Sequence, residues 1–200
     1  MIVVGLTGSI AAGKSTLANM FRELGAPVFD ADAAVHELYR GAFAIEVETA
    51  FPGVTSDGRV DRDRLSKFVV GDAEAMRRLE SIVHPAVAAL RRKFRDRARH
   101  SGARVAILDV PLLFETGGNG NVDVVLTVSA RPEIQRARAL ARPGASAERF
   151  EALLARQTPD VEKRRGAHFV IDTSGSITDS RRQAEDFLRA LAGAEGDGHA

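Results

Sequence analysis

The chain lacks cysteine and tryptophan and has a single tyrosine among its 200 residues. Without cysteine it can form no disulfide, iron–sulfur cluster or Cys-ligated zinc site. One tyrosine supplies little of the aromatic platform on which single-stranded nucleic acid stacks. These absences exclude several cofactor classes and argue against a nucleic-acid-binding module.

An excess of either charge is also missing, because Lys+Arg number 28 and Asp+Glu 27, a net charge of +1. With no global basic field, any polyanion must be bound by a local arrangement of groups. Four of the 28 cations are lysines, so 24 are arginines. The positions of the arginines must decide which of them matter for function.

Long hydrophobic runs are absent as well. The longest apolar run, Val105 to Phe114, is interrupted by Asp109 and falls short of the ~18 residues of a membrane-spanning helix. The first residues, Met1 to Leu6, carry no basic leader. We therefore expect a cytoplasmic protein with no membrane partner, large enough for one domain with its own core.

Short apolar segments alternate with helical patterns along the chain, which predicts an α/β fold with a parallel sheet between two helical layers. A long helical pattern over Ala73 to His100 is expected to be interrupted at His84-Pro85, because proline cannot donate within a helix. The five strands are expected at Ile2–Leu6, Val28–Phe29, Val105–Leu108, Asp123–Val128 and Phe169–Ile171.

The segment between the second and third expected strands is too long for a plain crossover. We expect it to be an inserted helical substrate subdomain, at about residues 31–102. The core of the single domain then comprises about 1–30, 103–131 and 166–192, and a lid occupies about 132–165. Residues 193–200 have the composition of a disordered tail.

Residues Gly8 to Ser15 read G-x-x-x-x-G-K-S, between a predicted strand and a predicted helix, which is the context that a P-loop requires. Backbone N–H groups from Ile10 to Thr16 are expected to face a bound phosphate at the positive end of the helix. Lys14 would bridge the β- and γ-phosphates and the Ser15 hydroxyl would hold Mg²⁺. The helix is indicated by the apolar residues Leu17, Met20, Phe21 and Leu24.

Asp109 ends the Val105–Leu108 strand, where a Walker B carboxylate would lie. It is a possible second magnesium ligand. A carboxylate in this place can equally cap the following turn, so Asp109 supports the nucleotide interpretation without deciding it.

Arginines mark the segment after the fourth strand. A helix from Pro132 to about Ala141 would present Arg138 and Arg142 on one face, four residues apart. Guanidinium groups match phosphate oxygens and stabilise transferring charge, so this helix is expected to belong to a lid. The alternative is a solvated, arginine-rich face.

A second lid helix is expected after the break at Pro143-Gly144. Ser146 can cap this helix, and its buried stripe is expected to comprise Phe150, Leu153 and Leu154. Together the two helices and the break between them would form a mobile cover for the phosphates.

Asp30-Ala31-Asp32 follows the second strand, at the edge where open α/β sheets bind ligands. Asp32 is a candidate to accept the proton of an acceptor hydroxyl. Its alternative is to cap the helix that contains Val35, Leu38 and Tyr39. Both roles can coexist.

The kind of P-loop protein is narrowed by one further absence, since the guanine-reading N-K-x-D of a GTPase does not occur. A small-molecule kinase remains the leading interpretation, with a nucleoside or nucleotide kinase as its runner-up. A regulatory protein that hydrolyses ATP slowly is the third, although it leaves Asp32 and the lid arginines unexplained.

The chain resembles the dephospho-coenzyme A kinase family over roughly Ile2 to Leu191. Any one motif except the P-loop is weak, but the ordered set is specific. In chain order the motifs are Gly5–Gly8 with the P-loop, Leu24-Gly25, Asp30–Asp32, Asp57–Arg62 with Leu65, Leu79–Pro85, Pro111–Glu115, Gln135 with Arg138 and Arg142, and Gln157.

This resemblance implies ATP-dependent phosphorylation of the ribose 3′-hydroxyl of dephospho-CoA. We expect a monomer or weak homo-oligomer. It implies Asp32, Lys14 and Arg138 as catalytic residues and places Arg62 in the CoA-binding subdomain. His84 alone would be a helix-terminus histidine. The implied ATP-binding residues are Ala11, Ala12, Gly13, Lys14, Ser15, Thr16 and Arg142, and the implied acceptor-binding residues are Asp32, His84, Leu112, Leu113 and Glu115.

The sequence departs from the family pattern in two places. The family's loop commonly reads Gly-Gly-Ile-Gly-Ser-Gly-Lys-Ser, whereas Ser9, Ala11 and Ala12 replace some of those residues here. After the fifth strand the family usually has Asn-x-Gly near the adenine, and this chain has Asp172-Thr173-Ser174-Gly175. Gly117 to Asn121 is expected to be a loop.

Overall fold

The computed structural model describes residues 1–194, which form two compact units. Unit 1 comprises Met1–Phe29 and the described residues from Ala98 onward, and unit 2 comprises Asp30–Arg97. Unit 2 covers nearly the residues of the expected insertion, whose role in substrate binding stays a prediction. Of the tail expected to be disordered, residues 193 and 194 end a helix and the rest lies outside the described residues.

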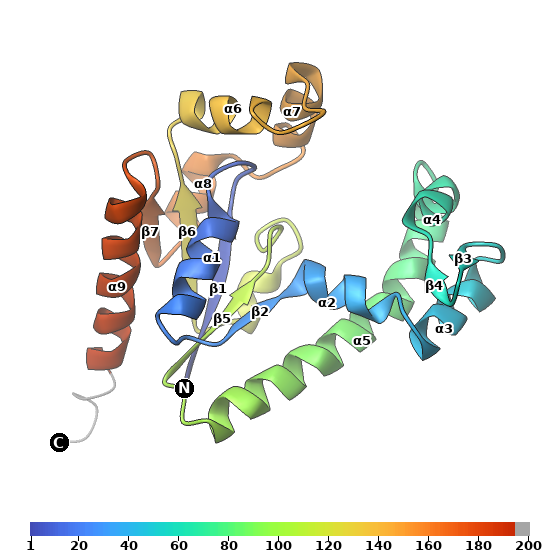
Figure 1. Ribbon diagram of the computed structural model, residues 1–200, viewed down its shortest axis with the longest axis horizontal. Coiled ribbons are helices and arrows are strands. Elements are labelled where there is room, and N and C mark those ends of the chain that lie inside the picture. The colour runs from blue at the N-terminus through green and yellow to red at the C-terminus, as the bar shows by residue number, and fades with distance from the viewer. Residues whose placement is uncertain (195–200) are drawn as a thin grey trace. The chain divides into compact units, whose positions relative to one another are not determined.

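Unit 1 is built on a five-stranded sheet, and all five expected strands are confirmed. In sheet order the strands are β2 (Val28–Asp30), β5 (Val105–Asp109), β1 (Ile2–Gly8), β6 (Val124–Ser129) and β7 (Phe169–Asp172). β1 pairs in parallel with β5 and β6, and β6 pairs in parallel with β7 (Figure 1). Because β1 is central, the loop after it lies at the middle of the sheet's carboxyl edge.

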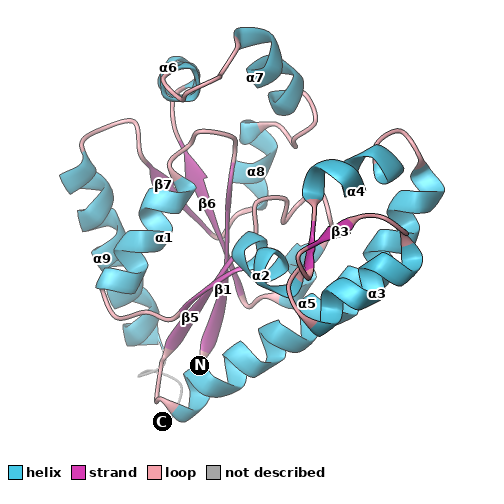
Figure 2. Ribbon diagram, turned by 45° about the vertical axis from the view of Figure 1, so that its right-hand side comes forward, coloured by secondary structure: helices cyan, strands magenta, loops and turns pink. Residues whose placement is uncertain are grey.

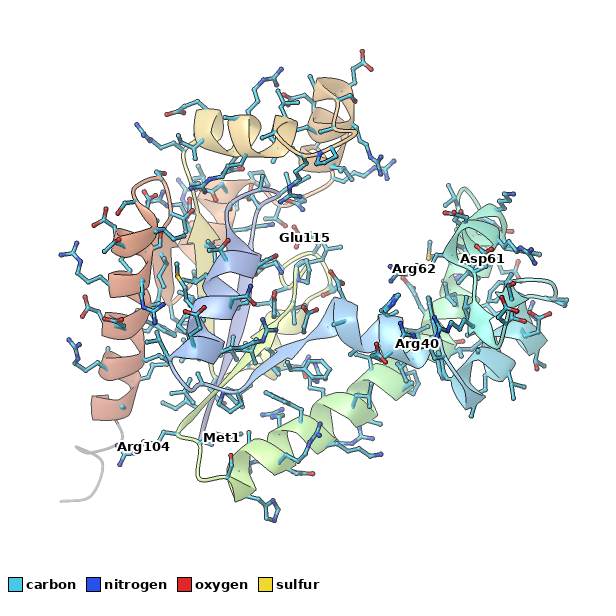
Figure 3. All side chains as sticks on the ribbon, in the orientation of Figure 1. Met1, Arg40, Asp61, Arg62, Arg104 and Glu115 are labelled. Atoms are coloured by element: carbon cyan, nitrogen blue, oxygen red, sulfur yellow. The ribbon has the colours of Figure 1, made fainter. Side chains whose placement is uncertain are left out.

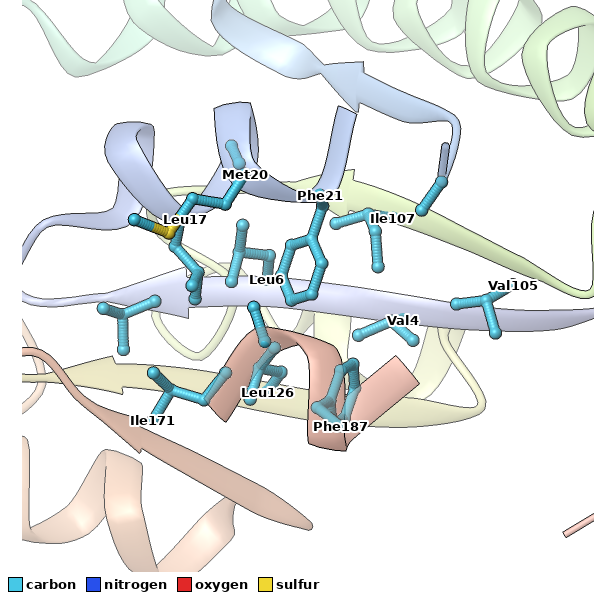
Figure 4. Close-up of a cluster of buried hydrophobic side chains, with 14 of the residues drawn as sticks. Val4, Leu6, Leu17, Met20, Phe21, Val105, Ile107, Leu126, Ile171 and Phe187 are labelled. Carbon is cyan, nitrogen blue, oxygen red and sulfur yellow. The ribbon is translucent and has the colours of Figure 1, made fainter. Parts of the chain in front are cut away.

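Helices cover both faces of this sheet. α1 (Lys14–Glu23) and α9 (Ile177–Ala194) pack together on one face, and α8 (Asp160–Gly166) packs against β6 on the other (Figure 2). Between the strands and the α1/α9 pair lies a core of aliphatic side chains, with the Phe21 and Phe187 ring centres 5.8 Å apart (Figure 4). Strands buried on both faces require such nearly continuous apolar sequence.

Two further helices, α6 (Pro132–Leu140) and α7 (Ala147–Leu154), come after β6 as expected. The Ser146 hydroxyl caps α7 by accepting the N–H of Arg149 at 3.1 Å. Of the expected stripe, Phe150 is buried, whereas Leu153 is 41% exposed, so that part of the prediction is wrong. The reason is that this short helix contributes only Phe150 and part of Leu154 to a small cluster with the P-loop and α6.

Unit 2 is helical apart from a short antiparallel hairpin. Its buried cluster is entirely apolar except for the phenol of Tyr39, whose pKa is raised by burial. This cluster gives the unit a core of its own. The elements are α2 (Ala31–Leu38), α3 (Ala42–Ala50), β3 (Thr55–Ser56), β4 (Arg59–Val60), α4 (Arg62–Val69) and most of α5 (Ala73–His100).

α5 runs without interruption through Pro85, so the expected break at His84-Pro85 is wrong. A proline inside a helix removes the hydrogen bond to the carbonyl four residues earlier. Here that carbonyl belongs to Ser81, and both Ser81 and Pro85 are exposed, so water can solvate the group. No helix within residues 1–194 is long and apolar enough to cross a membrane.

Candidate active site

The P-loop connects β1 to α1, and its two outer glycines are required by geometry. A Cβ on Gly8 would lie 2.6 Å from the carbonyl oxygen of Val128, so only glycine lets β1 end this close to β6. Gly13 precedes α1 with a φ of 91°, a conformation that favours glycine. The first turn of the helix leaves the N–H groups of Lys14, Ser15 and Thr16 without helical partners, which makes an anion site.

Two other N–H groups of the loop are already bonded. The N–H of Ile10 donates to Gln157 Oε1 at 2.9 Å, and that of Ala12 donates to the Ser9 carbonyl at 3.0 Å. The expectation that every N–H from Ile10 to Thr16 faces a phosphate is therefore wrong for these two in this structure. Gln157 instead fixes the start of the loop from the chain segment after α7.

Ala11 has a φ of 60°, in the left-handed region where the family commonly has glycine. Its methyl group is buried with Ala139 of α6 and Phe150 of α7. The alanine therefore combines backbone strain with an apolar contact to both α6 and α7. Small side chains at this position keep the loop close to a ligand.

Lys14 and Asp109 form an ion pair at the base of the loop. Asp109 is 3% exposed at the end of β5, while the Ser15 side chain is exposed at the start of α1. Residues 1–194 contain no cluster of three metal-ligating His, Cys, Asp or Glu side chains. A hydroxyl and a carboxylate without such a cage fit Mg²⁺, which takes few protein ligands and completes its shell with phosphate oxygens and water.

Arg138 of α6 reaches the P-loop through Thr173. Its Nη1 donates to Thr173 Oγ1 at 3.1 Å and its Nη2 donates to the Thr173 carbonyl at 2.7 Å. For Arg138 the alternative of a solvated face is therefore wrong. Arg142 is exposed and has no charged partner within the described part of the chain, whereas Arg136 pairs with Glu151 of α7.

These elements enclose a pocket of about 320 Å³ in unit 1. It is lined by apolar residues of α1, by Arg138 of α6 and Arg142 just after that helix, and by the loop after β7. Such a mixture suits a flat base attached to phosphates. The lining residues include Leu17, Met20, Arg138, Arg142, Thr173 and Ile177.

Glu115 is bound inside unit 1. Figure 3 labels this residue. Its carboxylate accepts the N–H of Thr158 at 2.8 Å and pairs with the fully buried Lys163 at 3.0 Å. Burial alone would raise the pKa of Glu115, but hydrogen bonds from its own backbone, from Lys163 and from Thr158 hold it below its ordinary value. As an acceptor-binding residue Glu115 stays a prediction, and its contacts show that it ties the segment after β5 to that after α7.

The neighbours of Glu115 differ in accessibility. Leu113 is 1% exposed and packs against Gly5, while Leu112 is 43% exposed. In this conformation only Leu112 offers surface to a substrate. The expected loop after them contains a short 3₁₀ helix, Gly118–Asn121.

In unit 2, Asp30 at the end of β2 and Asp32 in the first turn of α2 have separate roles. Asp30 caps α2 by accepting the N–H of Ala33 at 2.9 Å, so the alternative that Asp32 is the cap is wrong. Asp32 is exposed in the first turn, and its carboxylate has no bonding partner within residues 1–194. This leaves the carboxylate available to a ligand.

The remaining candidates of unit 2 also lie at its surface. His84 is exposed in the interior of α5, so it is not a helix-terminus histidine. The Arg62 guanidinium lies 5.9 Å from the ring centre of Tyr39 (Figure 3). Their roles toward an acceptor stay predictions.

Sequence reasoning gave no role to Thr173 or Lys163. Thr173 was visible only as a departure from the family pattern, and a single lysine in a charged segment gives no sign that it is buried. Gln157 was visible as a family motif without a function. Each needed the fold to show what it contacts.

Known proteins are similar to this chain over nearly its whole length. The family model described as dephospho-CoA kinase matches residues 2–179. The dephospho-CoA kinase of Nitrobacter winogradskyi is 55% identical over 192 residues, covering 96% of each chain, and that of Mesorhizobium japonicum is 53% identical over 196 residues, covering 98% of this chain and all of the relative.

Solved structures give the same result. A Thermus thermophilus protein is 37% identical with a TM-score of 0.81, covering 95% of this chain and 97% of that one. The dephospho-CoA kinase from Campylobacter jejuni is 25% identical with a TM-score of 0.66, covering 94% and 96%. Shikimate kinase from Acinetobacter baumannii, 18% identical with a TM-score of 0.52 over 97% and 94%, shares the fold.

Proposed function

Because the chain belongs to the dephospho-CoA kinase family, we propose that its site transfers the γ-phosphoryl group of ATP to the ribose 3′-hydroxyl of dephospho-CoA. The products are coenzyme A and ADP, so the reaction completes coenzyme A synthesis. The runner-up, a nucleoside or nucleotide kinase, is not favoured by the family match.

The P-loop binds the ATP phosphates in this proposal. The free N–H groups of Lys14, Ser15 and Thr16 and the Lys14 ammonium surround the β-phosphate, with Ala11 to Gly13 close enough for backbone contact. The 320 Å³ pocket beside α1 takes the adenine, between Leu17 and Met20 and the loop that contains Thr173. Arg142, which is exposed at this pocket, meets the outer phosphates.

Asp32 accepts the proton of the acceptor hydroxyl. The oxygen of that hydroxyl attacks the γ-phosphorus in line, the bond from phosphorus to the β,γ-bridging oxygen breaks, and the electron pair leaves with ADP. An exposed carboxylate relieved of helix capping by Asp30 suits this role. His84, Leu112 and Glu115 are proposed for the acceptor side, and the buried Leu113 is not.

Arg138 stabilises the negative charge of the transferring group. Its fork presents N–H donors in a plane that matches phosphate oxygens, and its position beside the P-loop needs no large rearrangement. Arg138 thus adds a positive charge next to the Ala12–Gly13 segment of the loop, besides the charge of Lys14.

Magnesium is the proposed cofactor, held by Ser15 and Asp109. Held there, the ion would supply positive charge to offset that of the transferring phosphates. The contribution of this chain is to place one hydroxyl and one carboxylate at the start of α1 and the end of β5. A cytoplasmic location and a monomeric or weakly oligomeric state stay predictions.

The observation that carries the proposal is a P-loop, with Lys14 at the start of α1, next to a pocket that Arg138 and Arg142 line. A regulatory ATP-binding protein needs the loop alone and leaves Arg138 and Asp32 unused. A kinase needs all of them.

The test is to incubate the full chain with ATP, MgCl₂ and dephospho-CoA and to measure coenzyme A by mass spectrometry. Coenzyme A is expected only when all three components are present. A panel with adenosine, AMP and shikimate as acceptors at fixed ATP tests specificity. Turnover of one of those acceptors in place of dephospho-CoA, or ATP hydrolysis alone by folded protein, would overturn the proposal.

A further inference from the structure

Thr173, the first residue after β7, contacts three separate segments of unit 1. Its hydroxyl donates to the Ala12 carbonyl of the P-loop at 2.7 Å, and its N–H donates to the Ser129 carbonyl at the end of β6 at 2.9 Å. It accepts from the Arg138 guanidinium through both its side chain and its carbonyl. The residue is 5% exposed, so these contacts are shielded from water.

The hydroxyl of Thr173 has one proton and two lone pairs, which limits what it can do. The contact to Ala12 is 2.7 Å and the alternative contact to the Ser129 carbonyl is 3.3 Å, so the proton goes to Ala12. The lone pairs are then free for Arg138, which has no acceptor atoms and can only donate. One oxygen atom therefore links a P-loop carbonyl to the lid arginine.

The same arrangement fixes how closely the guanidinium approaches the loop. A Cβ on Gly13 would lie 3.3 Å from Thr173 Oγ1 and 3.6 Å from Arg138 Nη1. With Nη1 on the hydroxyl and Nη2 on the carbonyl of one residue, the plane of the guanidinium is held at two points. Arginine positioned in this way loses less freedom when it later meets a phosphate.

We propose that Thr173 is a positioning residue that holds Arg138 against the Ala12–Gly13 segment of the P-loop before the nucleotide arrives. The proposal rests on the proposed role of Arg138 in stabilising the transferring phosphoryl group. Threonine suits the position because one small side chain both donates and accepts. Valine has the same shape and does neither, whereas serine keeps the hydroxyl.

The first experiment compares Thr173→Val with Thr173→Ser in steady-state assays with ATP, MgCl₂ and dephospho-CoA. In Thr173→Val, Arg138 keeps its hydrogen bond to the backbone carbonyl of residue 173 and loses the one to the side-chain hydroxyl. We expect kcat to fall about tenfold, as for a modest misplacement of a catalytic group. The Michaelis constant for ATP is expected to stay within about twofold, because uniform binding is not removed. Thr173→Ser is expected to restore most of kcat.

The second experiment is a double-mutant cycle with Arg138→Ala. If Thr173 acts through Arg138, adding Thr173→Val to Arg138→Ala lowers kcat no further. The matched control is Thr127→Val, since Thr127 is equally buried and donates instead to the Lys163 carbonyl at 3.3 Å. This control is expected to leave kcat within about twofold of wild type whatever it does to thermal stability.

The outcomes separate the two proposals. An Arg138→Ala variant with nearly normal turnover would contradict the role of Arg138 itself. An Arg138→Ala variant with a large loss, together with an independent further loss from Thr173→Val, would leave that role intact and overturn the positioning role. If only the Michaelis constant for ATP rises in Thr173→Val, Thr173 contributes to binding the base as a lining residue of the pocket and does not position Arg138, which would overturn the proposal as well.

Discussion

The two units of the chain have different interiors. Unit 1 buries nine of the polar or charged side chains that the structure describes, whereas no such side chain is buried in unit 2 between Asp30 and Arg97. The buried core of unit 2 is apolar apart from the Tyr39 hydroxyl. The nine in unit 1 are Thr7, Ser9, Asp109, Thr127, Ser129, Gln135, Lys163, Thr173 and Ser180.

This difference shows where each unit keeps its chemistry. A buried polar group is costly unless it is bonded. Most of these groups in unit 1 bond to backbone carbonyls or to a partner side chain, whereas the Ser9 hydroxyl has no hydrogen-bond partner among the described residues. Unit 2 keeps its candidate groups, Asp32 and His84, on its surface. Substitutions at the bonded polar groups of unit 1 are therefore expected to change stability, whether or not they change activity, while those at the exposed candidate groups of unit 2 are expected to change activity alone.

The largest effect is expected from Asp32→Asn. The amide cannot take the acceptor proton, so kcat should fall by a factor of about 10² to 10⁴. ATP binding, measured by calorimetry, and the melting temperature should stay near wild type because Asp32 has no structural partner within the described residues.

Asp30→Asn is the matched control for this prediction. Asparagine caps a helix about as well as aspartate, so this variant should keep both stability and turnover. Equal losses of kcat in the two variants would show that the segment, and not the Asp32 carboxylate, is required.

The next effect is on stability, through Glu115→Gln. The substitution leaves the Lys163 ammonium buried without its charged partner, which should lower the free energy of unfolding by about 3 to 5 kcal/mol. Urea denaturation at neutral pH measures this change.

Adding Lys163→Met to Glu115→Gln removes the unpaired charge and should recover much of the loss, because an apolar side chain of similar length fills the site. A double variant as unstable as the sum of the two single variants would mean that the two residues act independently.

The same pair predicts a pH dependence. Because the pKa of Glu115 in the folded chain is below its ordinary value of 4.5, its contribution to stability is present above pH 4.5 and is lost as the pH falls through the lowered value. Urea denaturation repeated in that acid range should show a shallower decline for Glu115→Gln than for wild type. Parallel declines would assign the acid sensitivity to other carboxyl groups.

The smallest effect is expected from Ala11→Gly. Relief of the left-handed strain, about 1 to 2 kcal/mol, is offset by the lost methyl contact and the greater freedom of the unfolded chain, so the net change should be within about 1 kcal/mol. Ala12→Gly is the control, since Ala12 is equally small and buried but has no positive φ.

At Ala12 there is no strain to relieve, so a glycine there only loses the methyl contact and gives the unfolded chain more freedom. In thermal denaturation, Ala12→Gly should therefore be less stable than Ala11→Gly. The opposite order would show that the Ala11 conformation carries no strain.

Much of the fold could be predicted from the sequence because the spacing of apolar residues and the P-loop motif indicated the same strands and helices. The buried strands are continuous apolar runs, and the P-loop sits between a strand and an amphipathic helix, as its residues require. The predicted break of the helix at Pro85 is wrong because water can solvate the exposed Ser81 carbonyl, which offsets the one helical hydrogen bond that the proline removes. The predicted burial of Leu153 is wrong because a sequence shows that a helix face is apolar but does not show whether another element packs against that face.

The candidate site was less predictable, since its contacts join residues far apart in the chain. The sequence offered Asp32 as the cap of this helix, and only the backbone shows that Asp30 holds the capping position. Ile10 with Gln157, Arg138 with Thr173, and Glu115 with Lys163 depend on the order of the strands. No local pattern encodes such pairs.

Because α5 is uninterrupted, the number of residues in this helix matters as well as their identity. The helix begins in unit 2 and ends in unit 1, so the chain passes between the units at Arg97–Ala98 within regular structure. Deleting one residue there would rotate the part of the helix before the deletion by about 100° about the helix axis relative to the part after it. It would also shorten the helix by about 1.5 Å. We therefore expect substitutions along this helix to be tolerated far better than changes in its length.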